Sequence, residues 1–284
     1  MNIRLLKQRA YFLIFRMVSV MVVFLFFVML WIFISNGAGV VNWTFLTDIP
    51  REGMTAGGIF PSIIGTIYIT LLTIAVAFPV GVASAIYMAE YAKGSRLVNI
   101  VNLAITNLAG VPSIIYGLFG FGLFVVFLSF GTSILSGALT LFLLVLPVVV
   151  SASREAILSI PNSFREASLA LGATKWQTVR HNVLPYALPG IFTGTILAIA
   201  RAAGETAPTI LTAAFFYKPT LPKSIFDGTM TLSTHIYYMA TQHPNITTVR
   251  PIVYGTTLVL LAIVLSLSIV TIIIRTEHRR RRKW

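Results

Sequence analysis

Six long apolar stretches dominate this chain of 284 residues, and they constrain its fold more than any other feature. A helix that crosses a hydrocarbon core about 30 Å thick needs about 20 mostly apolar residues. The stretches that meet this requirement are 17–35, 61–89, 98–128, 133–153, 187–216 and 251–274. None shows the alternation of apolar and polar residues that membrane barrel strands require. The sequence therefore predicts an all-α polytopic membrane protein with six transmembrane helices.

The composition agrees with this class. Apolar residues make up 57% of the chain and charged residues only 10%, whereas a soluble domain has about 45–50% and about 25%. The chain contains no cysteine. This excludes a disulfide scaffold, a thiol nucleophile and metal sites built on thiolates.

Basic residues mark the flanks of the spans rather than a nucleic-acid surface. The net charge is +13, and six of the 21 basic residues fall in the last ten positions. No aromatic residues interleave with them to stack on bases, so we predict membrane lipid as their partner and no nucleic acid. With the N-terminus inside, 16 lysines and arginines lie in cytoplasmic segments and 4 lie outside. The positive-inside rule then predicts that both termini are cytoplasmic. Because no cleavage site follows Ile34, the first span is expected to be a retained anchor.

Two interior stretches do not fit an uninterrupted lipid-facing helix. The segment from Asn107 to Ser113 places glycine, proline and polar groups at membrane depth, where freed backbone groups need protein or a wet cavity around them. The break either lines a pathway, with Ser113 in its wall, or is a kink that neighbouring helices satisfy. Gly190 and Gly194 begin a stripe of small residues that permits close helix approach, either within this chain or between chains.

Arg201 is the residue that points most strongly to an anion pathway. A rise of about 1.5 Å per residue places it about 20 Å into the fifth span, where an arginine is expected to face a partner or a wet cavity. Glu205 lies on the same face, and Pro208 predicts a kink beside the pair. A guanidinium suits phosphate, and the hydroxyls of Thr206 and Thr209 complete the predicted pathway. Alternatively, Arg201 and Glu205 neutralise each other as a structural ion pair.

The cytoplasmic segment 154–185 predicts two short helices joined at a glycine. Pro161 and the S-x-x-E spacing of Ser163 and Glu166 predict the start of the first helix. Gly172 predicts its left-handed end.

The second short helix has its own signals. Thr174 and Gln177 repeat the capping spacing, and Pro185 is expected to stop the helix. Apolar residues such as Leu171 and Trp176 recur at helical spacing in the two helices. Helices this short need a surface to pack against, which is either this protein's own helix ends or a groove on a separate protein.

The same segment resembles the EAA loop of ABC importer permeases. The family pattern reads E-A-A, three residues, G, nine residues, I-x-L-P, and this chain departs from it at Ser168 and Asn182. In that family the loop docks into the ATPase subunit. The coupling residues that the resemblance implies are Glu166, Ala167, Gly172, Trp176, Leu184 and Pro185.

Three further segments, 85–92, 109–120 and 201–208, are similar to the phosphate-specific branch of that family. The similarity implies a type I ABC importer permease fold and a heteromeric importer of inorganic phosphate in the bacterial cytoplasmic membrane. It also implies a sister permease subunit, two ATPase subunits and an external phosphate-binding protein. The predicted parts of the chain are an anchor and outer loop (1–59), a permease core with the coupling loop 154–185 (60–275) and a basic tail (276–284).

The chain is predicted to be a non-catalytic permease subunit. It lacks the G-x-x-x-x-G-K-[S/T] loop that cradles nucleotide phosphates, so ATP and Mg²⁺ are expected in the partner ATPase and no cofactor in this chain. It also lacks a nucleophile elbow and a carboxylate pair within one span. A permease for molybdate or sulfate remains an alternative. So does an ion-coupled secondary transporter, which would also place charges at mid-membrane but would not need a docking loop.

Polar residues elsewhere have simpler interpretations. The four histidines lack metal-ligand spacing and are expected to be solvated. Glu90 is expected to be a surface charge or to pair with Lys93, Arg96 or another chain. Apolar residues at helical spacing over 232–239 predict an interfacial helix on the outer side.

Overall fold

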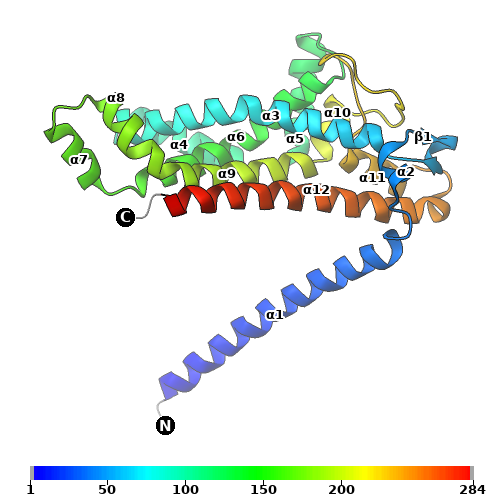
Figure 1. The fold of residues 1–284 in the computed structure, drawn as a ribbon, viewed down its shortest axis with the longest axis horizontal. Helices are drawn as coiled ribbons and strands as arrows, with labels where there is room; N and C mark the ends of the chain where they lie inside the picture. Colours follow the sequence, from blue (N-terminus) through cyan, green and yellow to red (C-terminus); the bar gives the residue numbers. More distant parts are fainter. Residues whose placement is uncertain (1–2, 282–284) are drawn as a thin grey trace.

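The computed structural model describes residues 3–281 as an elongated bundle of helices (Figure 1). The long helices that lie side by side in it are α3 (Phe60–Ile86), α6 (Ile134–Leu158), α9 (Leu184–Gly204) and α12 (Ile246–Arg281). α6 lies between α3 and α9 and is the most buried of them, with Leu141, Val145 and Val149 completely buried. Burial of such apolar side chains is what holds the helices together within this chain.

Shorter elements occupy the two ends of the bundle. One end carries η2 (Tyr87–Tyr91), α7 (Asn162–Ala170), α8 (Lys175–Thr178) and η4 (Val179–Val183). The other end carries α2 (Trp43–Thr47), β1 (Pro50–Arg51), η1 (Glu52–Met54), β2 (Ala56–Gly57), α10 (Ala207–Thr212) and α11 (Leu232–Thr241). β1 and β2 pair antiparallel. We call these the α7 end and the α11 end.

The predicted all-α polytopic architecture is confirmed. Within residues 3–281, five helical stretches are long and apolar enough to cross a membrane, and a bent pair of helices makes a sixth. The five stretches are Gln8–Gly37, Phe60–Tyr91, Ile134–Leu158, Lys175–Gly204 and Ile246–Glu277. The prediction of a fifth helix over 187–216 was wrong in its bounds, because the helical path begins before Pro185 and ends at Gly204.

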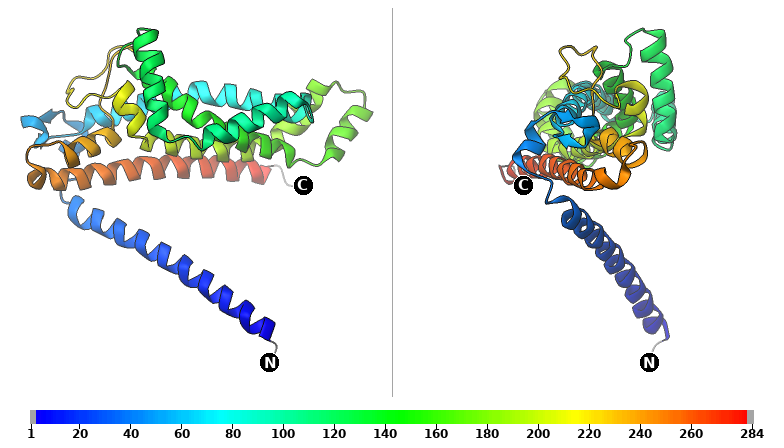
Figure 2. Two further views of the ribbon diagram at one scale, coloured as in Figure 1. Left: turned by 180° about the vertical axis from the view of Figure 1, so that it is seen from behind. Right: turned by 90° about the vertical axis from the view of Figure 1, so that its right-hand side faces the viewer.

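The third predicted span is a bent pair rather than a straight helix. It consists of α4 (Arg96–Ala109), α5 (Ser113–Gly120) and the π-helical turn η3 (Phe121–Phe127). The two halves are bent by 102° at the Gly110–Pro112 segment, where proline removes a donor and disfavours helical backbone before it. The Leu108 carbonyl, whose helical donor would be Pro112, accepts instead from the Val111 N–H at 3.1 Å and the Tyr116 hydroxyl at 2.8 Å. α5 and η3 therefore project sideways from the bundle (Figure 2).

Helix α1 (Ile3–Gly37) stands apart from the bundle. Both views show it leaving at an angle, with its C-terminal end against α12 (Figures 1 and 2). There the Phe33 and Tyr254 rings lie 6.0 Å apart, and Gly37 meets the backbone of Tyr254. In its most apolar 18-residue window, 0% of the residues are buried inside this chain. The helix thus presents an apolar surface to its membrane surroundings.

Two histidines at the α11 end are buried, so the prediction that they are solvated was wrong. His243 donates from Nε2 to the Gly53 carbonyl at 2.9 Å and fixes the β1–β2 hairpin against the bundle. His235 is 2% exposed, and neither ring nitrogen has a hydrogen-bond partner within the described part of the chain. The helix that carries it, α11, forms as expected, but Leu232 and Met239 are completely buried in protein.

Acid is expected to destabilise the α11 end through His235. Burial lowers the pKa of His235 from 6.5 to about 4. Between these two pH values, His235 is mostly protonated in the unfolded chain and mostly neutral in the folded chain. Stability is therefore complete above pH 6.5 and falls as the pH drops toward 4, by about 3 kcal/mol. Thermal unfolding in detergent from pH 7 to pH 4 measures this. His235→Leu should flatten the pH dependence of stability, whereas His181→Leu, at an exposed site, should not. Equal slopes of stability against pH for the wild type and both variants would contradict the role of His235.

Candidate substrate pathway and coupling surface

The α9 helix ends beside the predicted pathway residues. Arg201 lies in its last turn and Glu205 caps it in an extended conformation, and α10 then begins with Pro208 in its first turn. Proline has no N–H to donate and suits the start of a helix, so the helix restarts there instead of continuing. The predicted kink beside Arg201 and Glu205 is confirmed.

Hydroxyl groups satisfy the backbone carbonyls at this break. Thr209 is buried and donates to the carbonyls of Glu205 at 3.0 Å and Thr206 at 2.8 Å. Ser233 of α11, also buried, donates to the Glu205 carbonyl at 3.0 Å. Thr206 is partly exposed next to Glu205. Ser233 was missed in the sequence because it lies 28 residues away and carries no local signal.

Arg201 keeps most of its hydrogen-bonding capacity free. Its Nε donates to Glu205 Oε1 at 3.2 Å, and the side chains are 38% and 15% exposed, respectively. Among the described residues, its terminal Nη1 and Nη2 groups donate to no atom of this chain. A guanidinium has five N–H donors in a planar fork, so one long bond to Glu205 leaves the fork available to an anion.

Helix α5 lies close to the break. It packs on α10, so closely that a side chain at Gly117 would meet Pro208 Cα at 2.9 Å. Ser113 begins α5 and is partly exposed, but within the residues described no hydrogen bond joins its side chain to Arg201 or Glu205. The two broken spans thus meet, while a place for Ser113 in the pathway stays a prediction.

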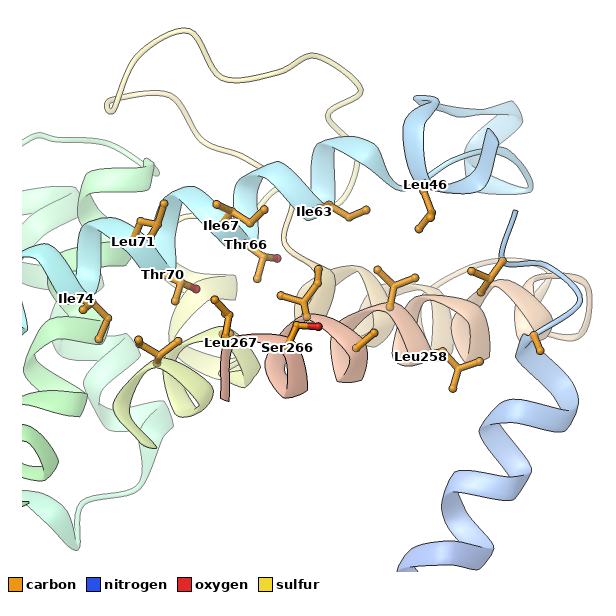
Figure 3. Close-up of a pocket in the computed structure, with 17 residues that line it drawn as sticks. Leu46, Ile63, Thr66, Ile67, Thr70, Leu71, Ile74, Leu258, Ser266 and Leu267 are labelled. Atoms are coloured by element: carbon orange, nitrogen blue, oxygen red, sulfur yellow. The ribbon is translucent and has the colours of Figure 1, made fainter. Parts of the chain in front are cut away.

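A large groove of about 1090 Å³ elsewhere in the bundle does not match an anion site (Figure 3). It lies between α3 and α12, and its polar side chains are Thr66, Thr70 and Ser266. The remaining lining is apolar and includes Ile67 and Leu71. Without a cation to offset the loss of hydration, such a groove disfavours a charged solute.

The small-residue stripe of α9 serves packing within the chain. A side chain at Gly190 would meet the Ala156 methyl of α6 at 2.6 Å, and one at Gly194 would collide with Ala152. The two glycines therefore set the close approach of α9 to α6. Of the two readings of this pattern, packing inside one chain is the one observed.

The coupling segment forms the two predicted helices, α7 and α8, with Gly172 between them. Gly172 has a φ of +83°, a conformation that an L side chain rarely adopts. Thr174 and Gln177 form the predicted capping box. The predicted Ser163–Glu166 box was wrong, since Pro161 holds the cap position without a side-chain bond.

Pro185 does not stop the second helix, which corrects another prediction. The chain passes from α8 through η4 into α9, and Pro185 lies in the first turn of α9. Proline is tolerated there because the first N–H groups of a helix have no intrahelical partner. The coupling helix α8 is therefore continuous with the span that carries Arg201.

The tip of the segment exposes an apolar surface. Leu171 is 89% exposed and Trp176 is 51% exposed, and Glu166 and Ala167 are exposed on α7. Leu184 and Pro185 are partly exposed at the base. Exposed apolar residues at such a protruding tip are typical of interaction surfaces, so the tip stays a candidate docking surface. Leu171 belongs to this surface although the family pattern does not single it out.

The two departures from the EAA pattern contact each other. Asn182 Nδ2 donates to Ser168 Oγ at 2.8 Å, and Ser168 Oγ lies 2.9 Å from Thr178 Oγ1. Ser168 and Thr178 are buried. The polar replacements therefore form one network that ties α7 to η4.

Because two of the three side chains in this network, Ser168 and Thr178, are buried, its members are expected to act together. Ser168→Ala should lower the free energy of unfolding of the assembled complex by about 1–3 kcal/mol, since it strands the Asn182 amide. Adding Asn182→Ile should recover most of that loss. Ser163→Ala, on the exposed face of α7, is the control. Thermal unfolding compares the wild type, Ser168→Ala, Asn182→Ile, the double variant and the control. Strictly additive losses for Ser168→Ala and Asn182→Ile would contradict the network.

Glu90 is neither a surface charge nor a partner of Lys93 or Arg96 within the described residues. Its carboxylate accepts from Arg165 of α7, with Arg165 Nη2 2.6 Å from Glu90 Oε1. The two expectations for Glu90 within this chain, a surface charge or a pair with Lys93 or Arg96, were therefore wrong. It links the end of the second span to the coupling helices.

Residues 81–284 match the family described as Binding-protein-dependent transport system inner membrane component. The probable ABC transporter permease protein YqgI of Bacillus subtilis (strain 168) is 36% identical over 220 residues, which cover 74% of this chain and 75% of that protein. The phosphate transport system permease protein PstA 1 of Mycobacterium tuberculosis (strain ATCC 25618 / H37Rv) is 36% identical over 260 residues, which cover 90% and 83%.

Solved importers share the fold. A chain of a bacterial alginate ABC transporter, in complex with an alginate pentasaccharide-bound periplasmic protein, aligns with a TM-score of 0.66 and 17% identity over 93% of each chain. A chain of the inward-facing MetNI methionine ABC transporter aligns with a TM-score of 0.59 and 20% identity, over 78% of this chain and 94% of that one. The chain therefore belongs to the binding-protein-dependent transport system inner membrane components and is the multi-pass, non-catalytic permease subunit of an ABC importer, which works with a separate ATPase, a second permease and a binding protein.

Proposed function

We propose that this chain is the permease subunit of an inorganic phosphate importer and forms half of its pathway around Arg201. The observation that carries the proposal is the free guanidinium fork of Arg201 at the break between α9 and α10. The similarity to phosphate transport permeases over most of the chain adds to it. A membrane-embedded arginine with unused donors needs a hydrated or anionic partner.

In this proposal Arg201 contacts the anion and Glu205 positions Arg201. A guanidinium matches two oxygens of a phosphate at once, and the Glu205 carboxylate can accept a hydrogen bond from a protonated phosphate oxygen. Thr206 lies beside them and Ser113 lines the wall. Thr209 supports the backbone of the break rather than the anion, since its hydroxyl is already used. One arginine beside a carboxylate is expected to bind phosphate only weakly, so the ion can also leave the site.

The coupling half of the proposal assigns the exposed tip of α7 and α8 to an ATPase subunit. The assembly is one sister permease, two ATPase subunits and an external phosphate-binding protein. The α7 end and both termini face the cytoplasm in this proposal. The membrane is the bacterial cytoplasmic membrane. Residues 60–275 form the permease core with the coupling loop 154–185, while 1–59 anchor the chain and 276–284 form the basic tail.

The test is ATP hydrolysis by the reconstituted complex with its binding protein. Phosphate is expected to stimulate hydrolysis and to be taken up, whereas sulfate and molybdate at equal concentration should not. Stimulation by one of those oxyanions in place of phosphate would reject the phosphate assignment. Failure of any ATPase subunit to copurify in mild detergent would reject the assigned docking surface.

A further inference from the structure

Arg165 ties three elements together at the α7 end. Its Nε and Nη2 donate to Glu90 Oε1 at 2.9 and 2.6 Å. Its Nη1 donates to the Ile160 carbonyl at 2.6 Å, and its Nη2 donates to the Ile157 carbonyl at 2.9 Å. The same cation thus holds η2, at the end of α3, and the C-terminal end of α6, where the helix dipole favours positive charge.

The ion pair is buried and joins distant parts of the chain. The side chains of Arg165 and Glu90 are 16% and 7% exposed, respectively, and the two residues are 75 positions apart. A buried pair costs desolvation energy and is therefore weak evidence for stability alone. Positioning of the coupling helices is a role of the Arg165–Glu90 pair that does not depend on a gain in stability.

The pair lies directly behind the docking surface. Arg165 and Glu166 are adjacent on α7, yet Arg165 is turned into the protein while Glu166 is exposed. The second coupling helix also contacts η2, because Lys175 Nζ lies 5.1 Å from the centre of the Tyr91 ring. A displacement of the docking surface therefore reaches α3 through η2 and α6 through its last carbonyls.

We infer that Arg165 and Glu90 are positioning residues that transmit movement of the ATPase-docking helices to α3 and α6. The inference rests on the proposed function for the docking surface, but it does not depend on which ion is transported. Docking itself uses the exposed face of α7 and α8. Loss of the pair thus uncouples hydrolysis from transport without releasing the ATPase.

The experiment compares Glu90→Gln, Arg165→Gln and the double variant in the complete complex. Copurification of the ATPase subunit should stay at the wild-type level, and phosphate uptake per ATP should fall about tenfold, within the usual range of coupling between sites. Hydrolysis without phosphate should rise in the variants. The double variant should be no worse than either single variant, because both remove the same pair. Glu52→Gln, which changes an exposed carboxylate in η1 at the α11 end, is the matched control and should resemble the wild type.

Each result decides the inference. Unchanged uptake per ATP in the variants would overturn it, and so would loss of uptake together with loss of the bound ATPase, because the pair would then serve docking alone. Arg165→Lys keeps the charge and is the variant expected to disturb folding least. It should retain the ATPase and show an intermediate loss of phosphate uptake per ATP. A wild-type complex that ignores phosphate would reject the phosphate assignment, while hydrolysis without phosphate would still report on the pair.

Discussion

Arg201→Ala is expected to lower phosphate uptake by about 100-fold, the cost of deleting the charged group that contacts the ion in the proposed pathway. The assembled complex should remain intact, because Arg201 makes one hydrogen bond to this chain, to Glu205, within the described residues. Uptake of labelled phosphate into proteoliposomes measures the effect, and copurification of the ATPase subunit monitors assembly.

Two further variants refine this result. Arg201→Lys keeps a positive charge but loses the planar fork, so it should retain intermediate uptake. Arg51→Ala removes an arginine that is paired with Asp48 in the exposed hairpin and should transport like the wild type. Full uptake by Arg201→Ala in an intact complex would show that Arg201 and Glu205 form a purely structural pair.

Gly172→Val is expected to release the ATPase subunit. Gly172 has open space around it, so the cost is not a collision but the φ of +83°, which costs an L residue about 1–2 kcal/mol and a β-branched one more. The turn would relax, and the exposed side chains of Leu171 and Trp176 would no longer lie in the arrangement that fits the ATPase subunit. The amount of ATPase subunit that copurifies in mild detergent should fall about tenfold.

Gly39→Val is the matched control for this substitution. Gly39 also has open space around it but lacks the left-handed φ, and it lies between α1 and α2, away from α7 and α8. ATPase binding should be unchanged in this variant. Equal losses of ATPase from both variants would show that valine acts through general destabilisation, and wild-type binding by Gly172→Val would contradict the role of the turn.

Several features set by neighbouring residues were predictable from the sequence, although the Ser163–Glu166 capping box was not among them. The Thr174–Gln177 box, the left-handed Gly172 and the pairing of Arg201 with Glu205 all depend on spacings of five residues or fewer. The break near Pro112 followed from the chemistry of proline. These predictions succeeded because helix geometry fixes which near neighbours meet.

Features set by distant contacts were not predictable. Glu90 meets Arg165 across 75 positions, and Ser233 reaches the carbonyl of Glu205 from another helix. His235 is enclosed by segments that no local pattern brings together.

Pro185 looked like a helix stop because its effect depends on whether it occupies the interior or the first turn of a helix.

The most direct test of the central claim is the water accessibility of position 201 in the membrane. This chain has no cysteine, so Arg201→Cys introduces its single thiol, and Phe24→Cys on the exposed surface of α1 is the control. A water-soluble, anionic thiol reagent is predicted to label position 201 in the assembled complex and to leave position 24 unlabelled. If position 201 is as unreactive as position 24, Arg201 does not lie on a hydrated anion route and the account is contradicted.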